Sequence, residues 1–257
     1  MKDRHIYEQP FTEKIRAWLR AEFLFSQIDY FLSQPSRWDT RAAIHAFLDL
    51  QQVLARTDMK PDLIADLEKQ QAGLMKLRDN PEVNTKRLRV VLDNVDSLRL
   101  QLIGPDKERN LSSLRHNEFL AAVRQRSSIP GGACDFDLPL YSWWLNQPEK
   151  PRRAAVRAWL EHFSLLRRAI TTLLLLHREG ASRSSRIAPS GYYQHIMEGA
   201  SNCHMVRVFL PAGAHCYPEI SGGRQRFSIR FLAMRDLDSR PSQVSDDVHF
   251  EIACCNQ

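Results

Sequence analysis

The sequence lacks the features of a membrane, secreted or low-complexity protein. Its apolar runs, such as Leu173–Leu176, are far shorter than the roughly 20 residues that a membrane-spanning helix needs. The first residues, Met1–His5, lead into no apolar segment, so we expect no secretory signal. Only 10 glycines and 13 prolines are scattered over the 257 residues, which excludes a collagen-like or low-complexity chain.

The sequence also has few cysteines and only a small net charge. The five cysteines are an odd number and lie mostly near the end, which argues against a disulfide framework and for reduced thiols in the cytosol. The chain has 36 basic and 30 acidic residues, a net charge of +6 that is spread along its length. A mild basic excess suggests an acidic partner, whether nucleic acid, anionic lipid or acidic peptide, and does not choose among them.

Motifs for catalysis are absent. The sequence has no phosphate-binding loop, no Gly-x-Gly-x-x-Gly and no Gly-x-Ser-x-Gly. Cys134 follows a glycine pair, yet no histidine is assigned to it, and a free cysteine is usually a small buried hydrophobe. In Cys203-His204 and His215-Cys216, neighbouring side chains point to opposite faces of a strand, so one tetrahedral site could use only one member of each pair. We therefore expect no catalytic residue, no metal and no cofactor.

The first 182 residues have helical periodicity. Apolar residues recur at spacings of three and four, and capping residues, prolines and glycines divide the pattern into segments. Thr12 and Thr40 are expected to cap the first two helices, Pro61 lies in the first turn of the third, and the fourth starts near Thr85. The later expected helices are Leu111–Arg126, a short aromatic one with Trp143 and Trp144, and a long one from Pro151 to Gly180.

The period changes after residue 182. Short β-type runs appear between clusters of Gly, Pro, Ser and Asp. We therefore predict an α+β protein, with a mainly α-helical domain over residues 1–182 and a small antiparallel β domain over residues 183–257, which the extended piece Ile6–Gln9 can join. The expected strands are Gly191–His195, Met205–Leu210, Arg224–Met234 and Val248–Cys254.

The most informative run is the predicted strand 224–234. Because a strand sends alternate side chains to opposite faces, basic residues share one face and apolar residues share the other. Neighbouring guanidinium groups would lie about 7 Å apart, an arrangement that suits the docking of carboxylates or phosphates. The alternative is a solvated face whose arginines pair with cross-strand acids such as Glu251. The basic face contains Arg224, Arg226, Ser228 and Arg230, and the apolar face contains Phe227, Ile229 and Phe231.

Two smaller basic clusters lie on predicted helices. Arg124 and Arg126 end the fifth helix, where complementing the helix C-terminus is an ordinary role for cations. Arg16 and Arg20 lie one turn apart on the first helix, a pattern typical of the solvated face of an amphipathic helix.

Four blocks of the sequence resemble the bacterial ZapD family of Z-ring-associated cell division proteins. They reach from the first helix to the last strand, so the resemblance covers essentially the whole chain, and several long blocks in order are more specific than a short motif. The blocks are Tyr7–Pro10 with Arg16–Leu24, Val123–Arg126 with Ser128–Gly132 and Phe136–Pro139, Tyr217–Gly222 with Arg226–Phe231, and Phe250–Cys255.

The resemblance implies a helical domain followed by a β domain, a symmetric homodimer and no catalytic activity. It also implies a cytoplasmic protein at midcell that binds the C-terminal tail of the tubulin-like GTPase FtsZ and cross-links FtsZ filaments into bundles. The positions that match the family's basic tail site are Arg56, Arg226 and Arg230, to which the strand pattern adds Arg224.

The resemblance further links a charged surface with bundling. Arg20 lies in a matched block and belongs to that surface, and we assign the other clustered cations, Arg16, Arg124 and Arg126, to it as well. Glu118 and Ser142 stand where family members can have a basic residue and a histidine, so those two roles are not transferred.

A nucleic-acid-binding module is the alternative from another class, because a basic β face with nearby aromatic rings could stack bases and hold phosphates. The discriminator is the direction of the aromatic side chains. Phe227 and Phe231 alternate away from the arginines, which favours a protein partner over nucleic acid. We expect no membrane partner, and an enzyme would need a pocket with strongly perturbed titratable groups.

Overall fold

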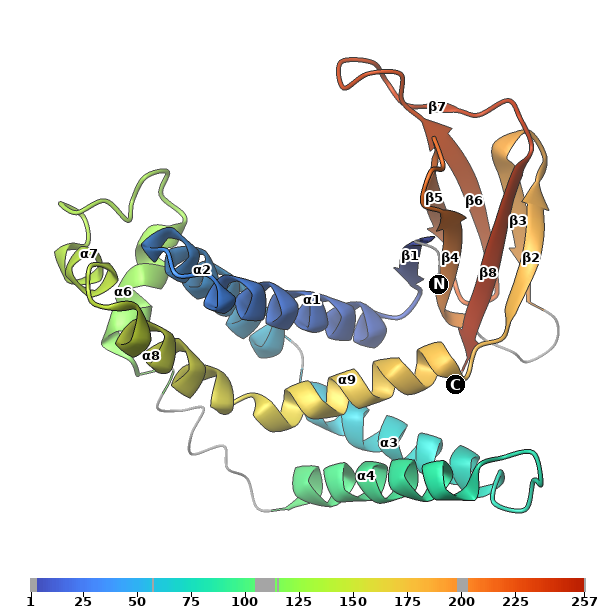
Figure 1. The fold of residues 1–257 in the computed structure, drawn as a ribbon, viewed down its shortest axis with the longest axis horizontal. Helices are drawn as coiled ribbons and strands as arrows, with labels where there is room; N and C mark the ends of the chain where they lie inside the picture. The colour runs from blue at the N-terminus through green and yellow to red at the C-terminus, as the bar shows by residue number, and fades with distance from the viewer. Residues whose placement is uncertain (1–3, 57, 105–113, 115, 198–202, 257) are drawn as a thin grey trace. The chain divides into compact units, whose positions relative to one another are not determined.

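A computed structural model of the chain describes residues 4–56, 58–104, 114, 116–197 and 203–256. Its elements confirm the α+β class, with the helices mostly preceding antiparallel strands (Figure 1). Two compact units divide the chain: residues 17–173 form a helical unit, and residues 1–16 together with 174–257 form a β unit. The last helix ends at Glu179 and the following strand begins at Arg183, on either side of the expected boundary near residue 182.

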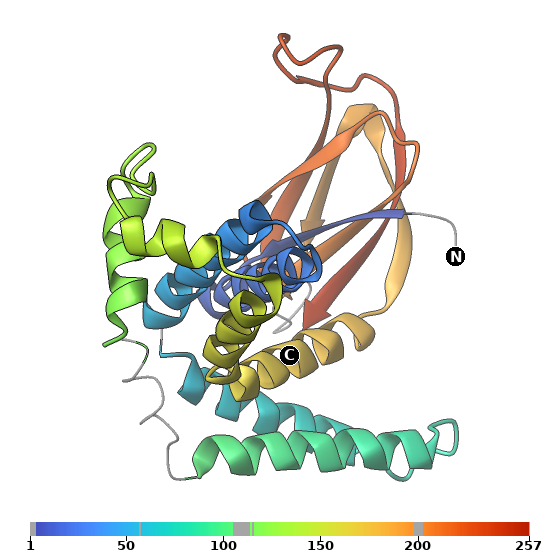
Figure 2. The same cartoon turned by 60° about the vertical axis from the view of Figure 1, so that its left-hand side comes forward.

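Most helices lie in the helical unit. Within it, α2 packs against α6, α7 and α8, whereas α3 and α4 lie side by side in both views (Figures 1 and 2). The helices are α1 (Glu13–Ser33), α2 (Arg37–Arg56), α3 (Met59–Met75), α4 (Thr85–Ile103), α6 (Glu118–Ser127), α7 (Pro139–Leu145), α8 (Glu149–Glu161) and α9 (Ser164–Glu179).

Side-chain caps determine where several helices begin. The Ile15 N–H donates to Thr12 Oγ1 over 3.4 Å, which confirms the expected cap of α1. Asp58 caps α3, whose first turn contains Pro61 as predicted. Asn84 caps α4, which begins at Thr85. These starts were predictable because a capping side chain acts on backbone groups only two or three residues away.

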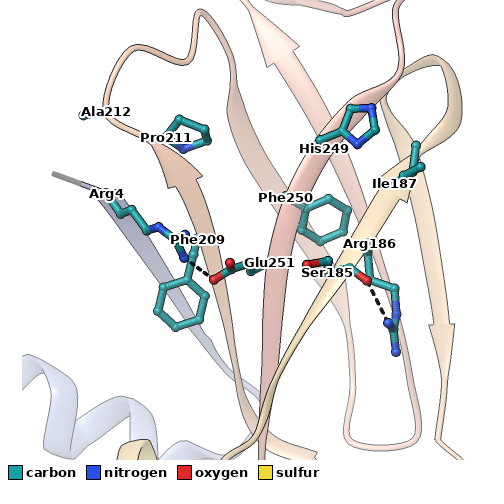
Figure 3. Close-up of a pocket in the computed structure, with 10 residues that line it drawn as sticks. All are labelled: Arg4, Ser185, Arg186, Ile187, Phe209, Pro211, Ala212, His249, Phe250 and Glu251. Atoms are coloured by element: carbon teal, nitrogen blue, oxygen red, sulfur yellow. Dashed lines mark hydrogen bonds and ion pairs between the residues drawn. The ribbon is translucent and has the colours of Figure 1, made fainter. Parts of the chain in front are cut away.

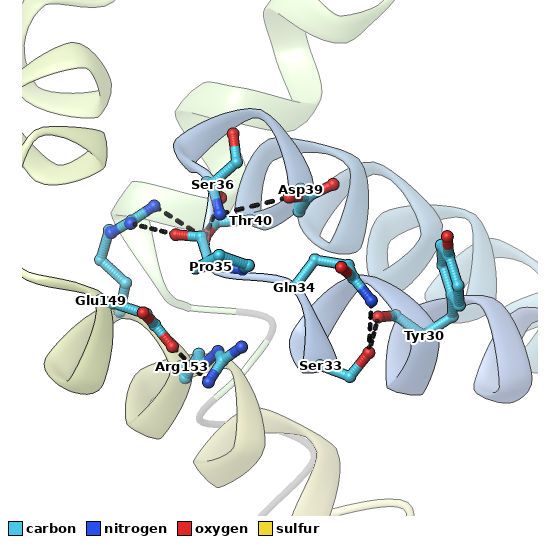
Figure 4. A network of polar contacts seen from close by, with 10 residues as sticks. Tyr30, Ser33, Gln34, Pro35, Ser36, Asp39, Thr40, Glu149 and Arg153 are labelled. Carbon is cyan, nitrogen blue, oxygen red and sulfur yellow. Dashed lines mark hydrogen bonds and ion pairs between the residues drawn. The ribbon is translucent and has the colours of Figure 1, made fainter.

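The start of α2 differs from the prediction, which placed the cap at Thr40. Ser36 and Asp39 cap this helix reciprocally. The Ser36 N–H donates to Asp39 Oδ2 over 3.2 Å (Figure 4), and the Trp38 N–H donates to Ser36 Oγ over 3.0 Å. Thr40 instead lies buried in the first turn, where its hydroxyl accepts a hydrogen bond from Arg152. The reciprocal pair satisfies two N–H groups, which Thr40 alone could not do.

The prediction of one long helix from Pro151 to Gly180 is wrong. The chain forms α8 and α9, separated at His162 and Phe163. The Phe163 N–H closes a turn on the Leu160 carbonyl, and the Phe163 carbonyl accepts the first bond of α9 from Arg167. The break lets the buried Phe163 ring pack against Phe47 of α2, with ring centroids 5.9 Å apart. Apolar periodicity along the sequence does not reveal this break, because the break depends on packing against a separate helix.

The fifth predicted helix is interrupted near its start: Leu114 is helical, but His116 lies in a turn and Asn117 is not helical. Helix α6 begins at Glu118, because the Asn117 side chain accepts a hydrogen bond from the Leu120 N–H over 3.0 Å and caps it there. Residues 111–113 and 115 of the predicted segment lie outside the described residues. The short aromatic helix is confirmed as α7.

The β unit is a sandwich of two antiparallel sheets. One sheet has the order β1-β4-β8-β2 and the other has the order β3-β6-β5, with β7 paired to β6. Strand β1 pairs with β4, which confirms that residues 6–9 join a sheet. The strands are β1 (Arg4–Pro10), β2 (Arg183–Ala188), β3 (Tyr192–Ile196), β4 (Cys203–Pro211), β5 (Tyr217–Gly222), β6 (Arg226–Ala233), β7 (Ser242–Gln243) and β8 (Val248–Asn256).

The core of the β unit lies between the two sheets. Both sheets turn alternate apolar residues inward, and their rings meet there: Phe231 of β6 and Phe250 of β8 have centroids 5.0 Å apart. This packing holds β6 by one face only. The buried members of the core are Ala188, Cys203, Val206, Val208, Leu210, Phe227, Ile229, Phe231, Phe250 and Ile252.

Three strands were not predicted from the sequence. Strand β2 is polar and lies at a sheet edge, so its sequence resembles a linker. Strand β5 contains Pro218, which a central strand does not tolerate but an edge strand does. Strand β7 has only two residues, too few for a pattern. These three segments therefore lack the apolar, turn-bounded run that makes a strand recognisable.

Across the described helices, none combines the length and the apolar character that a membrane span requires.

Candidate anion-binding face

The outer face of the β3-β6-β5 sheet presents basic side chains to solvent. Along β6, Arg226 and Arg230 are exposed while Phe227, Ile229 and Phe231 are buried, which confirms the predicted alternation. Ladder partners in antiparallel strands share a face. We call this outer surface the arginine face; it contains Tyr192, Gln194 and Ile196 of β3, Arg226, Ser228 and Arg230 of β6, and Tyr217, Glu219 and Ser221 of β5.

The two arginines of β6 differ in their partners. Arg230 pairs with Glu219, which lies directly opposite on β5. No carboxylate among the described residues forms an ion pair with Arg226. Both members of the Arg230–Glu219 pair are about half exposed, at 54% and 50%, so the pair is weakened by solvent. The face therefore has one cation, Arg226, without a counter-charge in the described part of the chain, and one, Arg230, whose weak ion pair an incoming anion can replace.

The predicted cross-strand acid was the wrong one. Glu251 lies on β8 in the other sheet, where it pairs with Arg4. Glu219 was missed because Pro218 argued against a strand at β5, although the block Tyr217–Gly222 belongs to the family resemblance.

Arg224 does not belong to the alternation of β6, contrary to the prediction. The strand begins at Arg226, and Arg224 lies in the turn from β5, where its carbonyl accepts a hydrogen bond from the Cys203 N–H. Gly222 adopts a positive φ of 133°, and a Cβ there would lie 2.5 Å from the Arg226 carbonyl oxygen. The turn therefore starts at Gly222, and Arg224 is an exposed cation at the end of the arginine face.

Aromatic side chains do lie beside the arginines, which corrects the sequence-based discriminator. Phe227 and Phe231 point into the core as predicted, but Tyr192 of β3 is the direct ladder partner of Arg230 and is 41% exposed. Ile196 is the partner of Arg226 and is 63% exposed. Sequence reasoning missed both, because strand pairing between segments 30 or more residues apart leaves no local signal.

Arg56 is the last residue of α2, in the helical unit, whereas Arg226 and Arg230 belong to the β unit. Its backbone position confirms only that it ends a helix, as the sequence predicted.

Arg16 and Arg20 lie on one side of α1, one turn apart as predicted. Arg16 donates to Glu13 over 3.0 Å, an ion pair within the same helix. Arg20 is exposed. Surface pairs at this spacing contribute little, so Arg16 can exchange its partner readily.

Arg124 and Arg126 have different surroundings on α6. Arg124 donates to the Gln51 side chain and lines a cavity of about 340 Å³. Arg126 forms an ion pair with Asp137, with 3.5 Å between Arg126 Nη1 and Asp137 Oδ1. The structure therefore does not gather these two cations into one exposed patch. The cavity is lined by Gln51, Gln52, Leu54, Ala55, Leu114, Arg124 and Phe163.

A larger hollow, of about 1120 Å³, lies on the outer face of the other sheet (Figure 3). Its two arginines differ in their partners: Arg4 pairs with Glu251, whereas Arg186 donates to two neutral groups, the Ser185 carbonyl and Tyr193 Oη. The hollow therefore contains one ion-paired arginine and one arginine whose partners are neutral.

Two other arginines of the β unit share one carboxylate inside the structure. Glu8 of β1 accepts two hydrogen bonds from Arg178 of α9, at 2.9 and 2.8 Å, and one from Arg207 of β4, at 2.8 Å. This partly buried cluster ties α9 to the sheet. It also distinguishes structural arginines from Arg226, whose guanidinium is turned to solvent.

Three cysteines of the β unit, Cys203, Cys216 and Cys254, pack in or against its core, and Cys255 is buried outside that cluster. Burial raises the pKa of the Cys255 thiol to about 12. The pKa of Cys203 is also raised, mainly by a hydrogen bond to Cys254 and secondly by burial. Those two thiols are therefore protonated and weakly nucleophilic at neutral pH. Among the described residues, no three His, Cys, Asp or Glu side chains are placed to hold a metal ion.

Comparison with known proteins gives a consistent family. The ZapD family profile, described as a cell division protein, matches residues 19–230. Proteins named Cell division protein ZapD are similar along their whole length. The relative from Methylococcus capsulatus is 34% identical over 255 residues, covering 99% of both chains. Those from Nitrosomonas eutropha and Bordetella pertussis are each 35% identical, covering 97% and 98% of this chain and 98% of their own.

Proposed function

Because the chain belongs to the ZapD family of cell division proteins, we propose that it is a non-enzymatic factor that binds the C-terminal tail of FtsZ and cross-links FtsZ filaments at midcell. A role in cell division follows from family membership. The more specific activity rests on the resemblance described above and on the chemistry of the arginine face.

The observation that supports tail binding is the state of Arg226. Its guanidinium is exposed and has no ion pair among the described residues, while the strand beneath it is anchored by buried Phe227 and Ile229. The packed strand fixes the backbone of Arg226, so binding a carboxylate orders the arginine side chain but requires no ordering of the main chain. Arg230 adds a second cation four residues along, roughly 13 Å away at the usual rise of a strand. An extended acidic segment can contact both.

Co-sedimentation with FtsZ polymers tests the proposal. The protein is expected in the pellet with full-length FtsZ polymers and in the supernatant with polymers of FtsZ that lacks its tail. Equal pelleting with both polymers would place the contact elsewhere on FtsZ, and no pelleting with either would refute the proposed activity.

Cross-linking requires at least two tail sites per particle, so we propose a symmetric homodimer. One site per monomer then gives two per dimer, and avidity multiplies a weak single contact. Light scattering under bundling conditions is expected to give about twice the monomer mass of 29.8 kDa. A monomer mass while bundles form would contradict the dimer.

Removing the internal competitor should strengthen tail binding. Glu219→Gln keeps the size of the side chain but withdraws the negative charge from Arg230. An exposed ion pair contributes about 0.2–1 kcal/mol, so tail affinity at low salt should rise by a factor of about 1.4 to 5. Titration of a labelled tail peptide measures the change, with Glu251→Gln, which affects Arg4 in the other sheet, as the matched control. Unchanged or weaker binding to Glu219→Gln would mean that Glu219 does not compete.

For the remaining sites we propose roles in line with the family. Arg56 joins the tail contact, and Arg20 with Arg16 forms part of the surface used in bundling. Arg124 and Arg126 are weaker candidates for that surface, because Gln51 and Asp137 already engage them.

Nucleic-acid binding is the second candidate, and Tyr192 is the observation that favours it. An exposed ring beside Arg230 could stack on a base while the arginine holds a phosphate. Glu219, on the same face, opposes this because it repels phosphates. Anisotropy titration of a labelled oligonucleotide beside the tail peptide separates the two candidates: we expect saturation with the peptide only.

A further inference from the structure

The arginine face has an apolar component that matches its basic one. Each arginine of β6 lies directly across from an apolar side chain of β3: Arg230 from Tyr192, and Arg226 from Ile196. Between these two pairs lie only small or neutral polar residues, Gln194, Ser228 and Ser221. A cation therefore lies beside an apolar side chain at both ends of a neutral stretch, and Glu219 lies on the other side of Arg230.

The apolar members are unusually exposed for their position. The outward positions of an antiparallel sheet with one solvated face are normally polar. Ile196 is nevertheless 63% exposed and Tyr192 is 41% exposed. Their exposed surface lies next to the cations on the solvent side, so a ligand that reaches the guanidinium groups also reaches these side chains.

We propose that Tyr192 and Ile196 form the apolar half of the tail site, so that its ligand is an extended segment in which apolar side chains accompany the acids. This inference rests on the proposed function and specifies the ligand of the same site. A run of acids alone would satisfy Arg226 and Arg230 but leave both apolar side chains in water.

The two halves of the site should respond differently to salt. Attraction between exposed charges is screened at high ionic strength, because the Debye length falls to about 3 Å at 1 M salt. Burial of apolar surface is not screened in this way. The contribution of the arginines should therefore shrink as salt rises, while that of Tyr192 and Ile196 persists.

The test is a titration of labelled FtsZ tail peptide at low and high salt with the variants Tyr192→Ser and Ile196→Ser. Each is expected to weaken binding about tenfold at low salt, in line with the loss of a buried apolar contact, and by a similar factor at high salt. Arg226→Gln should weaken binding strongly at low salt and less at high salt. The matched control is Ile187→Ser, which removes an exposed isoleucine from β2 of the other sheet and should bind as the wild type does.

Changes in the peptide provide the complementary experiment. A tail peptide whose apolar residues are replaced by serine, and a polyglutamate of equal charge, should both bind the wild-type protein weakly. Wild-type affinity of the Tyr192 and Ile196 variants, or of the serine-substituted peptide, would overturn the inference while leaving tail binding intact. Tight binding of polyglutamate or of an oligonucleotide would overturn it too. Failure of the native tail peptide to bind the wild-type protein would instead refute the proposed function itself and the inference with it.

Discussion

Charge reversal at Arg226 or Arg230 is expected to abolish detectable binding of the FtsZ tail while leaving thermal melting nearly unchanged. Loss of a charge-assisted hydrogen bond costs on the order of 1.5–3 kcal/mol, and replacing attraction by repulsion costs more. Both side chains are exposed on the outer face of β6, and the core packs against its other face. The substitutions therefore remove the ligand contact and spare the contacts that stabilise the fold.

Fluorescence anisotropy of a labelled tail peptide, beside a melting curve for each variant, measures this expectation. Arg240→Glu is the matched control, since it changes the net charge equally at an exposed residue outside the arginine face. It should bind like the wild type apart from a small general effect at low salt. Folded Arg226→Glu and Arg230→Glu proteins that bind the tail normally would show that the arginine face is not the tail site.

Truncation of Phe227 should have the opposite effect, destabilising the fold while leaving the ligand face unaltered. Phe227 is 1% exposed, and its ring stacks on Phe11 with centroids 5.3 Å apart and packs against His195 at 5.1 Å. Phe227→Ala removes a buried ring and leaves a cavity between the sheets, which costs roughly 3–5 kcal/mol of unfolding free energy. The fraction of molecules that stay folded should still bind the tail, because Phe227 points away from it.

Urea unfolding of Phe227→Ala and wild-type protein gives the change in free energy. Leu237→Ala, at a position that is 91% exposed, serves as the control and should change stability by no more than about 0.5 kcal/mol. Ordinary substitutions destabilise proteins by about 1 kcal/mol on average. If Phe227→Ala lowers the unfolding free energy by less than that, the core is not tightly packed at this position.

Local patterns in the sequence determined much of this protein. The alternation along β6 identified the buried and exposed residues correctly from Arg226 to Phe231. Helix starts at Thr12 and near Thr85 were equally predictable. Burial on one face and capping both depend on residues within a few positions of one another, so they leave a signal that periodicity and residue type can report.

Only the tertiary structure decided which side chains stand beside the arginines. Glu219, Tyr192 and Ile196 join Arg226 and Arg230 through strand pairing, and a one-residue change of register would have turned each of them to the opposite face. The break between α8 and α9 arose in the same way, from the packing of Phe163 on α2. Such neighbours are selected by long-range contacts, which depend on how separate elements fit together and not on the order of residues within either one.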